Sequence, residues 1–357
     1  MTTESSPFEF KQLPKLQPGD QVAILSPSFV APAFFPHVHE LGLQRLRDIF
    51  GLHPVEFPST RNREATHGEK ARDLIDAFSN PEIKGVIATI GGDDQIEWVR
   101  HLPSEPFREN PKPFFGYSDN THLAHHLWQN GIPSYYGGSL FVQFARQCEM
   151  DPLTIQYLQR ALFDSGVFEL EQSKEYNDED LPWEDPSILQ QKRRYQPCQG
   201  WQWDTGTSDT GHEVQGITWG GCLESIDELL RHHITLPSLS QCEQIILCLE
   251  TSEELPPAAY VARVLRALGG LGILERIQGL FVGRAKAWSF EQPNRDAEKV
   301  LYQEEQQKVI IEMVRRYNPS APIVQNMDFG HTDPQICLPL GHLATINMRE
   351  QKISIQF

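Results

Sequence analysis

"EKARDLIDAFSNPEIKGVIATIGG", residues 69 to 92, holds the pattern of a helix followed at once by the pattern of a buried strand. The apolar residues with the helical spacing i, i+3, i+4 and i+7 are Ala71, Leu74, Ile75 and Phe78. This spacing predicts an amphipathic helix that ends before Pro81. The β-branched run after Pro81 ends in Gly91 and Gly92, as a buried parallel strand does before a loop. A helix and a buried strand in alternation predict an α/β fold.

The same signals recur on both sides of this stretch. "QVAILSPS" (21 to 28) and "QIILCLE" (244 to 250) are further buried strands, and "PPAAYVARVLRALGG" (256 to 270) has proline at a helix start and glycine at its end. A long helix is expected around 296 to 317, and "ATINMREQKISIQF" (344 to 357) alternates like a terminal hairpin. We therefore expect an N-terminal α/β domain with a mainly parallel sheet and a smaller, mixed, strand-rich C-terminal domain.

The chain has 357 residues, more than one domain usually contains, so two domains are expected. We place the N-terminal domain at residues 1–170 and the C-terminal domain at 213–357. The segment between them, 171–212, is acidic and turn-rich, which favours an interdomain crossing or a long functional loop. Its tryptophans are Trp183, Trp201 and Trp203. Because large aromatic side chains mostly serve burial, packing is their preferred role, and a pocket wall is the alternative.

Charge and composition argue against several kinds of partner. Lys and Arg number 31 against 48 Asp and Glu, a formal charge of -17, which argues against nucleic acid and anionic membranes as partners. No stretch approaches the length of a membrane span, and "MTTESSPFEFKQLPK" at the start lacks the apolar core of a signal peptide, so a cytoplasmic protein is expected. The six cysteines form no CxxC pair, which favours free thiols over a zinc site or a disulfide framework.

A serine stands where a strand pattern changes to a helix pattern in "NPKPFFGYSDNTHLAHHLWQNG", residues 110 to 131. The apolar run stops at Gly116, and an amphipathic stretch begins after Ser118. Such a turn lifts the serine hydroxyl out of the sheet and leaves the backbone N–H of Asp119 free, as a nucleophile and its oxyanion require. On this stretch alone, Ser118 as a helix N-cap is the simpler interpretation, because Ser-Asp-Asn-Thr suits a helix start.

A serine nucleophile needs a general base and an acid that orients it. His331 in "MDFGHTDP" follows a strand-like run, in the type of loop where a base reaches a site above strand ends, although a surface loop histidine is the alternative. Glu250 ends the apolar strand from 244, and a carboxylate there is costly without a partner. Glu253 and Glu254 are expected to be acids of the first turn of the following helix.

Two further features are weaker signals. His122 and His126 have the i, i+4 spacing of a zinc pair, but the pattern lacks the Glu of HExxH and a third ligand, so no metal is predicted. The turn at Gly91 and Gly92 lets the backbone approach a ligand closely, and its N–H groups can complete an oxyanion site. It matches neither GxGxxG nor a Walker loop, so it gives little support to a nucleotide-binding fold.

Several motifs, in one order along most of the chain, resemble the LD-carboxypeptidase family of serine peptidases and, within it, the microcin C immunity-protein branch. The motifs are "LQPGDQVAILSPS", "RDLIDAFSNPEIKGVIATIGGDD", "NPKPFFGYSDNTHL", "WGGCLESIDELL", "LCLETSEE" and "FGHTDP". The resemblance implies a triad of Ser118, Glu250 and His331, and an oxyanion hole made by Gly91, Gly92 and the N–H of Asp119. It also implies a site between the two domains, no metal or cofactor, and often a homodimer.

Departures from the family pattern give the candidate substrate contacts Asp93, Cys222 and Trp183. "IGGDD", which contains Asp93, replaces the "GGYG" of the murein-recycling members. Cys222 stands where many relatives have Asn after two glycines, so the substrate differs if that Asn touches substrate in them. The immunity branch suggests that a loop tryptophan, for which Trp183 is the candidate, stacks on a nucleotide base.

We therefore predict a serine hydrolase that cleaves an amide of a small peptide or a peptide–nucleotide conjugate through an acyl-enzyme intermediate. A murein tetrapeptide is the alternative substrate. A catalytically silent binding protein on the same fold is the alternative from another class. An ordinary α/β-hydrolase ranks last, because it expects Gly two residues after the serine, where Asn120 stands.

Overall fold

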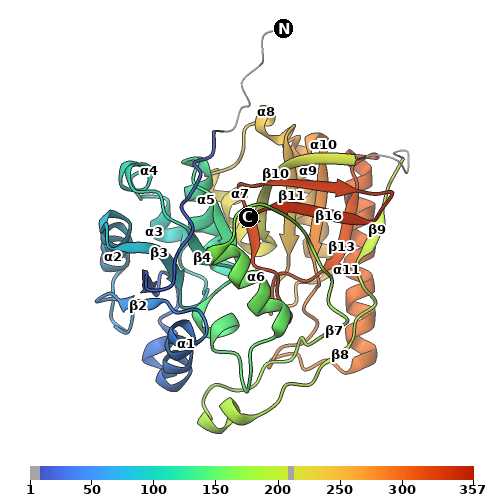
Figure 1. Cartoon of the computed structure of the whole chain (residues 1–357). Helices are drawn as coiled ribbons and strands as arrows, with labels where there is room; N and C mark the ends of the chain where they lie inside the picture. Colours follow the sequence, from blue (N-terminus) through green and yellow to red (C-terminus); the bar gives the residue numbers. More distant parts are fainter. Residues whose placement is uncertain (1–8, 208–212) are drawn as a thin grey trace.

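The computed structural model describes residues 9–207 and 213–357, and its two large sheets occupy the two halves of the chain (Figure 1). Residues 1–8 and 208–212, the latter being the end of the predicted connecting segment, lie outside the described residues. Helices and sheets alternate as expected, so the predicted α/β class is confirmed.

Sheet A has the strand order β14-β5-β4-β3-β1-β2. Its strands are β1 (Gln21–Leu25), β2 (His53–Glu56), β3 (Ile83–Ala88), β4 (Phe114–Gly116), β5 (Ser134–Tyr136) and β14 (Leu338–Leu340). All of its neighbours pair in parallel except β14 and β5, which are antiparallel. The carboxyl ends of β3 and β4 therefore lie at the same edge, and the Gly-Gly turn and Ser118 both follow there.

Sheet B has the order β6-β16-β15-β10-β11-β12-β13-β9. Its strands are β6 (Val167–Glu169), β9 (Gln202–Asp204), β10 (Glu213–Cys222), β11 (Ile245–Glu250), β12 (Gly279–Gly283), β13 (Ile323–Met327), β15 (Leu343–Asn347) and β16 (Lys352–Gln356). The run β10 to β13 is parallel and the outer pairs are antiparallel, so the predicted mixed sheet and terminal hairpin are confirmed. A small separate pair contains β7 (Glu175–Tyr176) and β8 (Gln196–Pro197).

Helices cover the sheets. In the first half they are η1 (Ala31–Ala33), α1 (Pro36–Asp48), α2 (His67–Ser79), α3 (Ile96–Val99), α4 (Glu105–Glu109), η2 (Ser118–Asn120), α5 (Thr121–Gln129), η3 (Leu140–Phe144) and α6 (Pro152–Phe163). In the remainder they are η4 (Pro186–Gln190), α7 (Leu223–His232), α8 (Leu239–Cys242), α9 (Ala258–Gly270), α10 (Ile273–Arg276) and α11 (Asp296–Tyr317). Helix α2 begins with a capping box in which Thr66 and Glu69 satisfy each other's backbone N–H, and it ends before Pro81 as predicted.

One apolar cluster joins the two sheets. It contains Ile24 and Phe115 from sheet A together with Cys248 and Ile346 from sheet B, all buried. Separate clusters lie between sheet B and helices α7, α9 and α11, and between sheet A and α2. Because the shared cluster is continuous, the edge of sheet A that follows β4 and the end of β11 are held in fixed relation.

Three short strands cross the predicted boundaries. β6 lies before residue 170 but pairs with β16, β9 lies in the connecting segment but pairs with β13, and β14 lies near the C-terminus but pairs with β5. The described part of the connecting segment passes the lower end of the molecule in Figure 1 and rises on the right to β9, whose pairing with β13 ties it to sheet B. The division at 170 and 213 stays a prediction.

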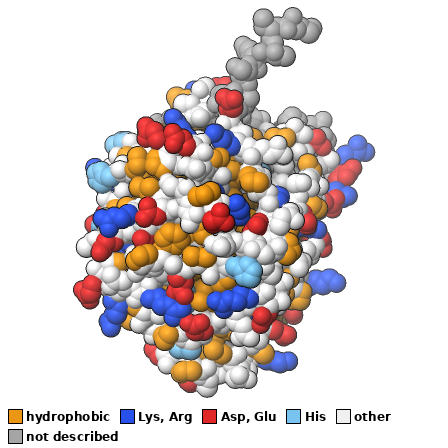
Figure 2. All heavy atoms as spheres, turned by 60° about the vertical axis from the view of Figure 1, so that its left-hand side comes forward, with side chains coloured by type: hydrophobic (Ala, Val, Ile, Leu, Met, Phe, Trp, Pro, Cys, Tyr) orange, Lys and Arg blue, Asp and Glu red, His pale blue; other side chains and the backbone are white. Residues whose placement is uncertain are grey.

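The surface shows no segregation of charge on the face in Figure 2, where acidic and basic side chains alternate with apolar patches. Within the described ranges, no helix combines the length and apolar character of a membrane span. All six cysteines are free, as predicted, and four of them are buried.

Candidate active site

Ser118 stands on a strained turn between a strand and a helix. Strand β4 ends at Gly116, and the helical segment η2 begins at Ser118 itself and leads into α5. The φ angle of Ser118 is 63°, a left-handed value that is costly for a side chain other than glycine and marks functional turns. The N-cap positions belong to Tyr117 and Asn120, so the alternative in which Ser118 caps a helix is wrong.

Glu250 and His331 form a close pair. Oε2 of Glu250, the last residue of β11, lies 2.7 Å from Nδ1 of His331 in the loop after β13. Both side chains are buried, with 7% of the His331 side chain exposed. Gly330 makes this packing possible, because a Cβ there would lie 2.4 Å from Glu250 Oε2 and its φ is +96°. The carboxylate therefore fixes the orientation of the imidazole ring.

Tyr136 links this pair to Ser118. Its hydroxyl donates to Glu250 Oε1 at 2.5 Å and accepts the backbone N–H of Ser118 at 3.2 Å. The ring of Tyr117 also lies 4.8 Å from that of His331. Tyr136 is the last residue of β5, which pairs with β4, so its side chain lies beside the turn that follows β4. The turn of Ser118 and the Glu250 carboxylate therefore contact the same hydroxyl group.

The other ring nitrogen of His331 faces a second carboxylate. Nε2 lies 3.2 Å from Oε2 of Glu253, whose side chain is 56% exposed. Although burial acts to lower it, the charges of Glu250 and Glu253 raise the pKa of His331 to about 9. The expectation that Glu253 and Glu254 start the next helix is wrong, because α9 begins at Ala258, after two prolines, and its first turn holds no acid.

The Gly-Gly turn packs directly against Ser118. A Cβ on Gly91 would lie 2.8 Å from the Cβ of Ser118 and 3.3 Å from the backbone nitrogen of Asp119. A Cβ on Gly92 would lie 2.1 Å from Ser28 Oγ. Both positions therefore need glycine for steric reasons, and the turn brings its backbone next to the serine hydroxyl and the N–H of Asp119.

A hollow of about 390 Å³, here called the first hollow, opens over Ser118 and His331. Its apolar wall is made by Phe29, Phe35, Ile90, Tyr117, Val142, Leu181, Trp183 and Phe290, and its charged groups are Arg146, Asp180, Glu184, Glu253, Lys286 and Glu291. Trp183 packs edge-on against Phe35 and Phe141, at 5.6 and 5.5 Å between ring centroids. Trp183, predicted as a substrate contact, thus packs against the core and also lines the hollow.

A second hollow, of about 180 Å³, lies on the other side of Ser118. Its carboxylates are Asp93, Asp119, Glu224, Asp227, Glu228, Glu253 and Glu254. The predicted contacts Asp93 and Cys222 line this hollow, and the Cys222 thiol donates to Glu224 at 3.2 Å. Burial, and then the charges of Glu253, Glu228 and Asp93, raise the pKa of Glu254, which indicates crowded negative charge.

Among residues 9–207 and 213–357, Asp119, His122 and Glu228 form a group that could hold a metal, since their donor atoms lie within 4.8 Å of one another. The ring nitrogens of His122 lie 2.9 Å from Asp119 and 3.2 Å from Glu228. Despite burial, these carboxylates raise the pKa of His122 to about 9, so we interpret the group as an imidazolium between two acids. His126, the other half of the considered zinc pair, packs instead against Phe107 at 5.3 Å.

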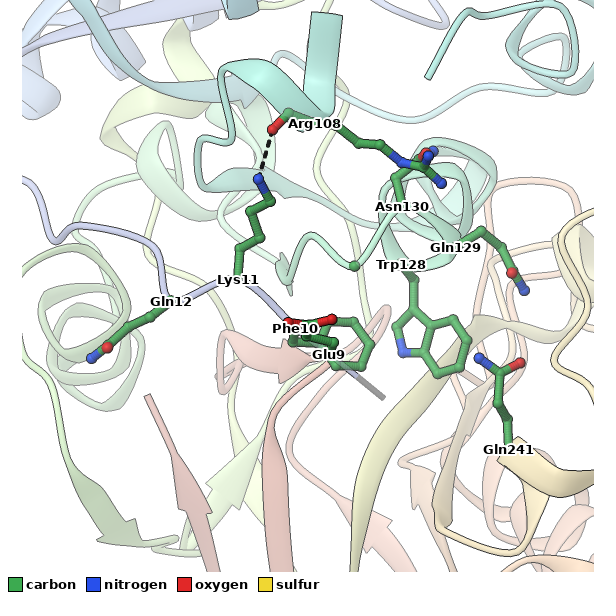
Figure 3. A pocket seen from close by; sticks show the side chains of 10 residues that line it. Glu9, Phe10, Lys11, Gln12, Arg108, Trp128, Gln129, Asn130 and Gln241 are labelled. Atoms are coloured by element: carbon green, nitrogen blue, oxygen red, sulfur yellow. Dashed lines mark hydrogen bonds between the residues drawn. The ribbon is translucent and has the colours of Figure 1, made fainter. Parts of the chain in front are cut away.

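A hollow of about 700 Å³ lies apart from these residues, where the N-terminal segment passes the end of α5 (Figure 3). Lys11 donates to the Arg108 carbonyl oxygen at 2.8 Å, and Phe10 meets Trp128 edge-on. Its ten lining residues include none of the predicted site residues. The chemistry predicted from the sequence therefore belongs to the two hollows at Ser118.

Sequence reasoning missed four residues of this region: Tyr136, Arg146, Glu253 as a partner of His331, and Lys286. Tyr136 is the last residue of a three-residue strand, and Arg146 and Lys286 stand in irregular segments after η3 and β12. Glu253 lies within the motif "LCLETSEE", and the other three belong to none of the quoted motifs. Their contacts join residues far apart in the chain, such as Tyr136 and Glu250 with 114 positions between them, so no local pattern identifies them.

The family of the chain follows from comparison with known proteins. Residues 22–137 match the LD-carboxypeptidase N-terminal domain, and residues 215–346 match the LD-carboxypeptidase C-terminal domain. Together these matches cover more than half of the chain, which therefore belongs to the LD-carboxypeptidase family, a family of peptidases.

Within this family, the chain is similar to the microcin C7 self-immunity protein MccF of Escherichia coli, with 24% identity over 82% of this chain and 79% of the relative. Among solved structures, an MccF-like protein from Streptococcus pneumoniae in complex with AMP has 27% identity, a TM-score of 0.81, and coverage of 94% of this chain and 98% of its own. MccF in complex with glutamyl sulfamoyl guanosine has a TM-score of 0.80, 23% identity and coverage of 97% and 98%, which supports the fold.

Proposed function

We propose that this protein is a serine peptidase with Ser118 as nucleophile, His331 as general base and Glu250 as the acid that orients the base. The observation that carries the proposal is the buried 2.7 Å contact between Glu250 and His331 at a hollow that also contains Ser118 on its strained turn. The contact through the Tyr136 hydroxyl supports it further. Nucleophile, base and acid are the parts that acyl transfer needs.

In the proposed reaction, neutral His331 takes the proton of the Ser118 hydroxyl as the oxygen attacks the carbonyl carbon of the substrate. The resulting imidazolium returns the proton to the leaving amine, and an acyl-enzyme remains. Water, activated by the same ring, then attacks the ester and releases the acid. Glu250 stays ionised and stabilises the imidazolium, while Glu253 has to move away from Nε2 for the ring to serve Ser118.

We further propose that the backbone N–H groups of Gly91, Gly92 and Asp119 stabilise the oxyanion. Gly91→Ala tests this, because its Cβ would lie 2.8 Å from the Ser118 Cβ and would displace the turn. Turnover should fall by about 10²- to 10³-fold, the usual loss for one donor. Gly270→Ala is the matched control, since no atom lies within 4 Å of its added Cβ. Equal activity of both variants would contradict the oxyanion assignment.

As substrate we propose a small peptide joined to a nucleotide through an amide-type bond, with a murein tetrapeptide as the alternative. Trp183 in the wall of the first hollow supports the first choice, because an indole face can stack on a base. The ligands of the MccF-like relatives, AMP and glutamyl sulfamoyl guanosine, point the same way. A homodimer and contacts of Asp93 and Cys222 with substrate complete the proposal.

The test is an activity panel with mass spectrometry as readout. Release of a nucleotide-bearing amine from a peptide–nucleotide conjugate supports the first substrate, and release of a terminal D-alanine from the tetrapeptide supports the second. Ser118→Ala should lose roughly 10⁴- to 10⁶-fold in kcat. Ser165→Ala, an exposed serine outside both hollows, is the matched control and should remain active. A Ser118→Ala protein with wild-type turnover would refute the proposal.

A fluorophosphonate probe separates the enzyme from a catalytically silent binding protein. It should label the wild type and Ser165→Ala but not Ser118→Ala, because only an activated serine reacts. Ligand binding without labelling and without turnover of any substrate in the panel would favour the binding protein.

A further inference from the structure

Two buried cations stand in the wall of the first hollow, the one that contains Ser118 and His331. Arg146 follows the helical segment η3, and Lys286 follows strand β12. Their side chains are 7% and 3% exposed. Burying a cation to this extent is costly unless it has an anionic partner, so the partners of these two side chains decide how much positive charge remains unpaired.

Arg146 shares its carboxylate with another arginine. Its NH2 donates to Asp333 Oδ1 at 2.7 Å, and the other oxygen of Asp333 accepts from Arg193. Two guanidinium groups on one carboxylate leave an excess of positive charge. Burial, and then repulsion from Arg146, lower the pKa of Arg193 to about 10, and the charges of Lys286, Arg146 and Arg193 lower the pKa of Asp180 although burial opposes this.

Both cations keep donors available. Within the described residues, the buried Nε of Arg146 makes no hydrogen bond. The Lys286 ammonium donates to the Asp178 carbonyl oxygen at 3.1 Å and to Asp180 Oδ2 at 2.6 Å, which uses two of its three hydrogens. An anion in the first hollow would therefore meet Arg146 and Lys286, which line it, whereas the Nε of Arg146 is itself buried.

The second hollow is the more acidic of the two. Seven carboxylates line it, and its one arginine, Arg231, is paired with Asp227. The first hollow has two cations against the acids Asp180, Glu184, Glu253 and Glu291. The two hollows meet at Gly92, Ser118 and Glu253, which line both of them. A negative charge on the substrate is therefore less costly beside Arg146 and Lys286 than in the second hollow.

We propose that Arg146, assisted by Lys286, is the anion subsite of the first hollow and binds a carboxylate or phosphoryl group of the substrate. The proposal rests on the peptidase function proposed above and names the charge that its substrate carries. A guanidinium binds both anions well, because its fork of N–H donors matches their paired oxygens. The anion has two possible sources: the free terminal carboxylate of a peptide, or the phosphoryl group of a nucleotide.

The first experiment compares a peptide that ends in a free carboxylate with the same peptide as its terminal amide. In the wild type, kcat/KM should be larger for the acid by on the order of 10- to 100-fold, the value of a charged hydrogen bond. Arg146→Gln should abolish this preference by lowering only the value for the acid. Arg231→Gln is the matched control, because Arg231 lines the second hollow and is paired with Asp227, and it should leave the ratio of acid to amide unchanged.

The second experiment needs no turnover. Affinities of the Ser118→Ala protein for AMP and for adenosine, and for the two peptides, are measured by titration calorimetry, with and without Arg146→Gln. If the phosphoryl group is the natural anion, AMP binds on the order of 10- to 100-fold more tightly than adenosine, and Arg146→Gln removes the difference. If the terminal carboxylate is the natural anion, the peptide with the free carboxylate binds more tightly than its amide, and Arg146→Gln removes that difference instead.

Equal affinities within both ligand pairs, or a preference for the anion that survives Arg146→Gln, would overturn the anion subsite. If turnover still depends on Ser118 in that case, only the anion subsite is overturned and the proposed peptidase function stands. Anion binding that requires Arg146, in a protein without Ser118-dependent turnover, would instead separate the subsite from the peptidase function. Lys286→Met should reduce the preference for the anion only in part, and it provides a second variant should Arg146→Gln fail to fold.

Discussion

The two hollows that meet at Ser118 differ in charge and in lining. The first combines an aromatic and aliphatic wall with the cations Arg146 and Lys286 and the acids Asp180, Glu184, Glu253 and Glu291, whereas the second is lined mainly by carboxylates and hydroxyl groups. Both lie at the carboxyl edge of sheet A, beside the same serine. In the proposed peptidase, the reacting bond would lie between a hollow of mixed charge and an acidic one, so a substrate with unlike ends would bind preferentially in one direction.

The largest effect is expected where the hollows meet. Glu250→Gln should lower kcat by about 10³- to 10⁴-fold, because an amide cannot stabilise the imidazolium and can favour the wrong tautomer. The loss should be the same for neutral and anionic substrates. Stopped assays over a range of substrate concentrations give kcat and KM separately. An effect confined to KM would break the comparison, since the chemistry would then lie elsewhere.

Charge reversal in the second hollow sharpens the comparison by a smaller amount. Glu254→Lys removes one of the crowded carboxylates and adds a cation, so it should raise the affinity for an anionic substrate by up to about fivefold, the value of an exposed charge pair. Glu298→Lys is a control at an exposed position on α11, away from both hollows. Equal changes in the two variants would mean that only the net charge of the protein matters.

Glu253 belongs to both hollows and its removal should shift the pH profile. The limb of kcat/KM that rises with pH follows deprotonation of His331. Burial acts to lower the pKa of His331, but the charges of Glu250 and Glu253 outweigh it and raise the pKa to about 9. Glu224 lies near enough to add to this effect, and the ring of Tyr117 faces the histidine. Glu253→Gln should move the limb to lower pH and raise activity at pH 7 by up to about fivefold. An unchanged profile would exclude Glu253 as a partner of His331 in solution.

The smallest expected effect concerns stability. The pKa of His122 in the folded protein, about 9, lies above its unfolded value, so its ion pairs stabilise the fold fully below about pH 6.5, and this contribution is lost as pH rises towards 9. His331 adds a change of the same sign. Urea unfolding between pH 6 and pH 10 should show this decline, and His122→Gln should flatten it. A wild type that gains stability over this interval would contradict the ion pairs assigned to both histidines.

The sequence predicts the elements and the three residues of the proposed triad because each has a local signal. Ser118 follows a strand at a turn, Glu250 ends an apolar run, and the loop of His331 follows another strand. Parallel strands place such ends at the same edge of a sheet, which is why a pattern along the chain becomes proximity in space.

Other features depend on contacts that no local pattern encodes. Tyr136 lies at the end of a three-residue strand and matters only because Glu250 comes within 2.5 Å of its hydroxyl. The acids Glu253 and Glu254 were expected in a helix, but Pro256 and Pro257 delay its start and leave both in a loop over the site. The charge of Arg146 is understood only once Asp333 and Arg193 are seen to meet it.

Strand β14 has a consequence for how substrate enters. Seven positions after His331 it joins sheet A, with Leu338 opposite Tyr136, so the loop of the base is fastened at one end to β13 and at the other to the neighbour of the serine strand. A hinge motion that separated the two sheets would break the hydrogen bonds between β14 and β5. In the proposed peptidase, substrate would therefore enter the first hollow past its lining, to which Trp183 belongs, without separation of the two sheets.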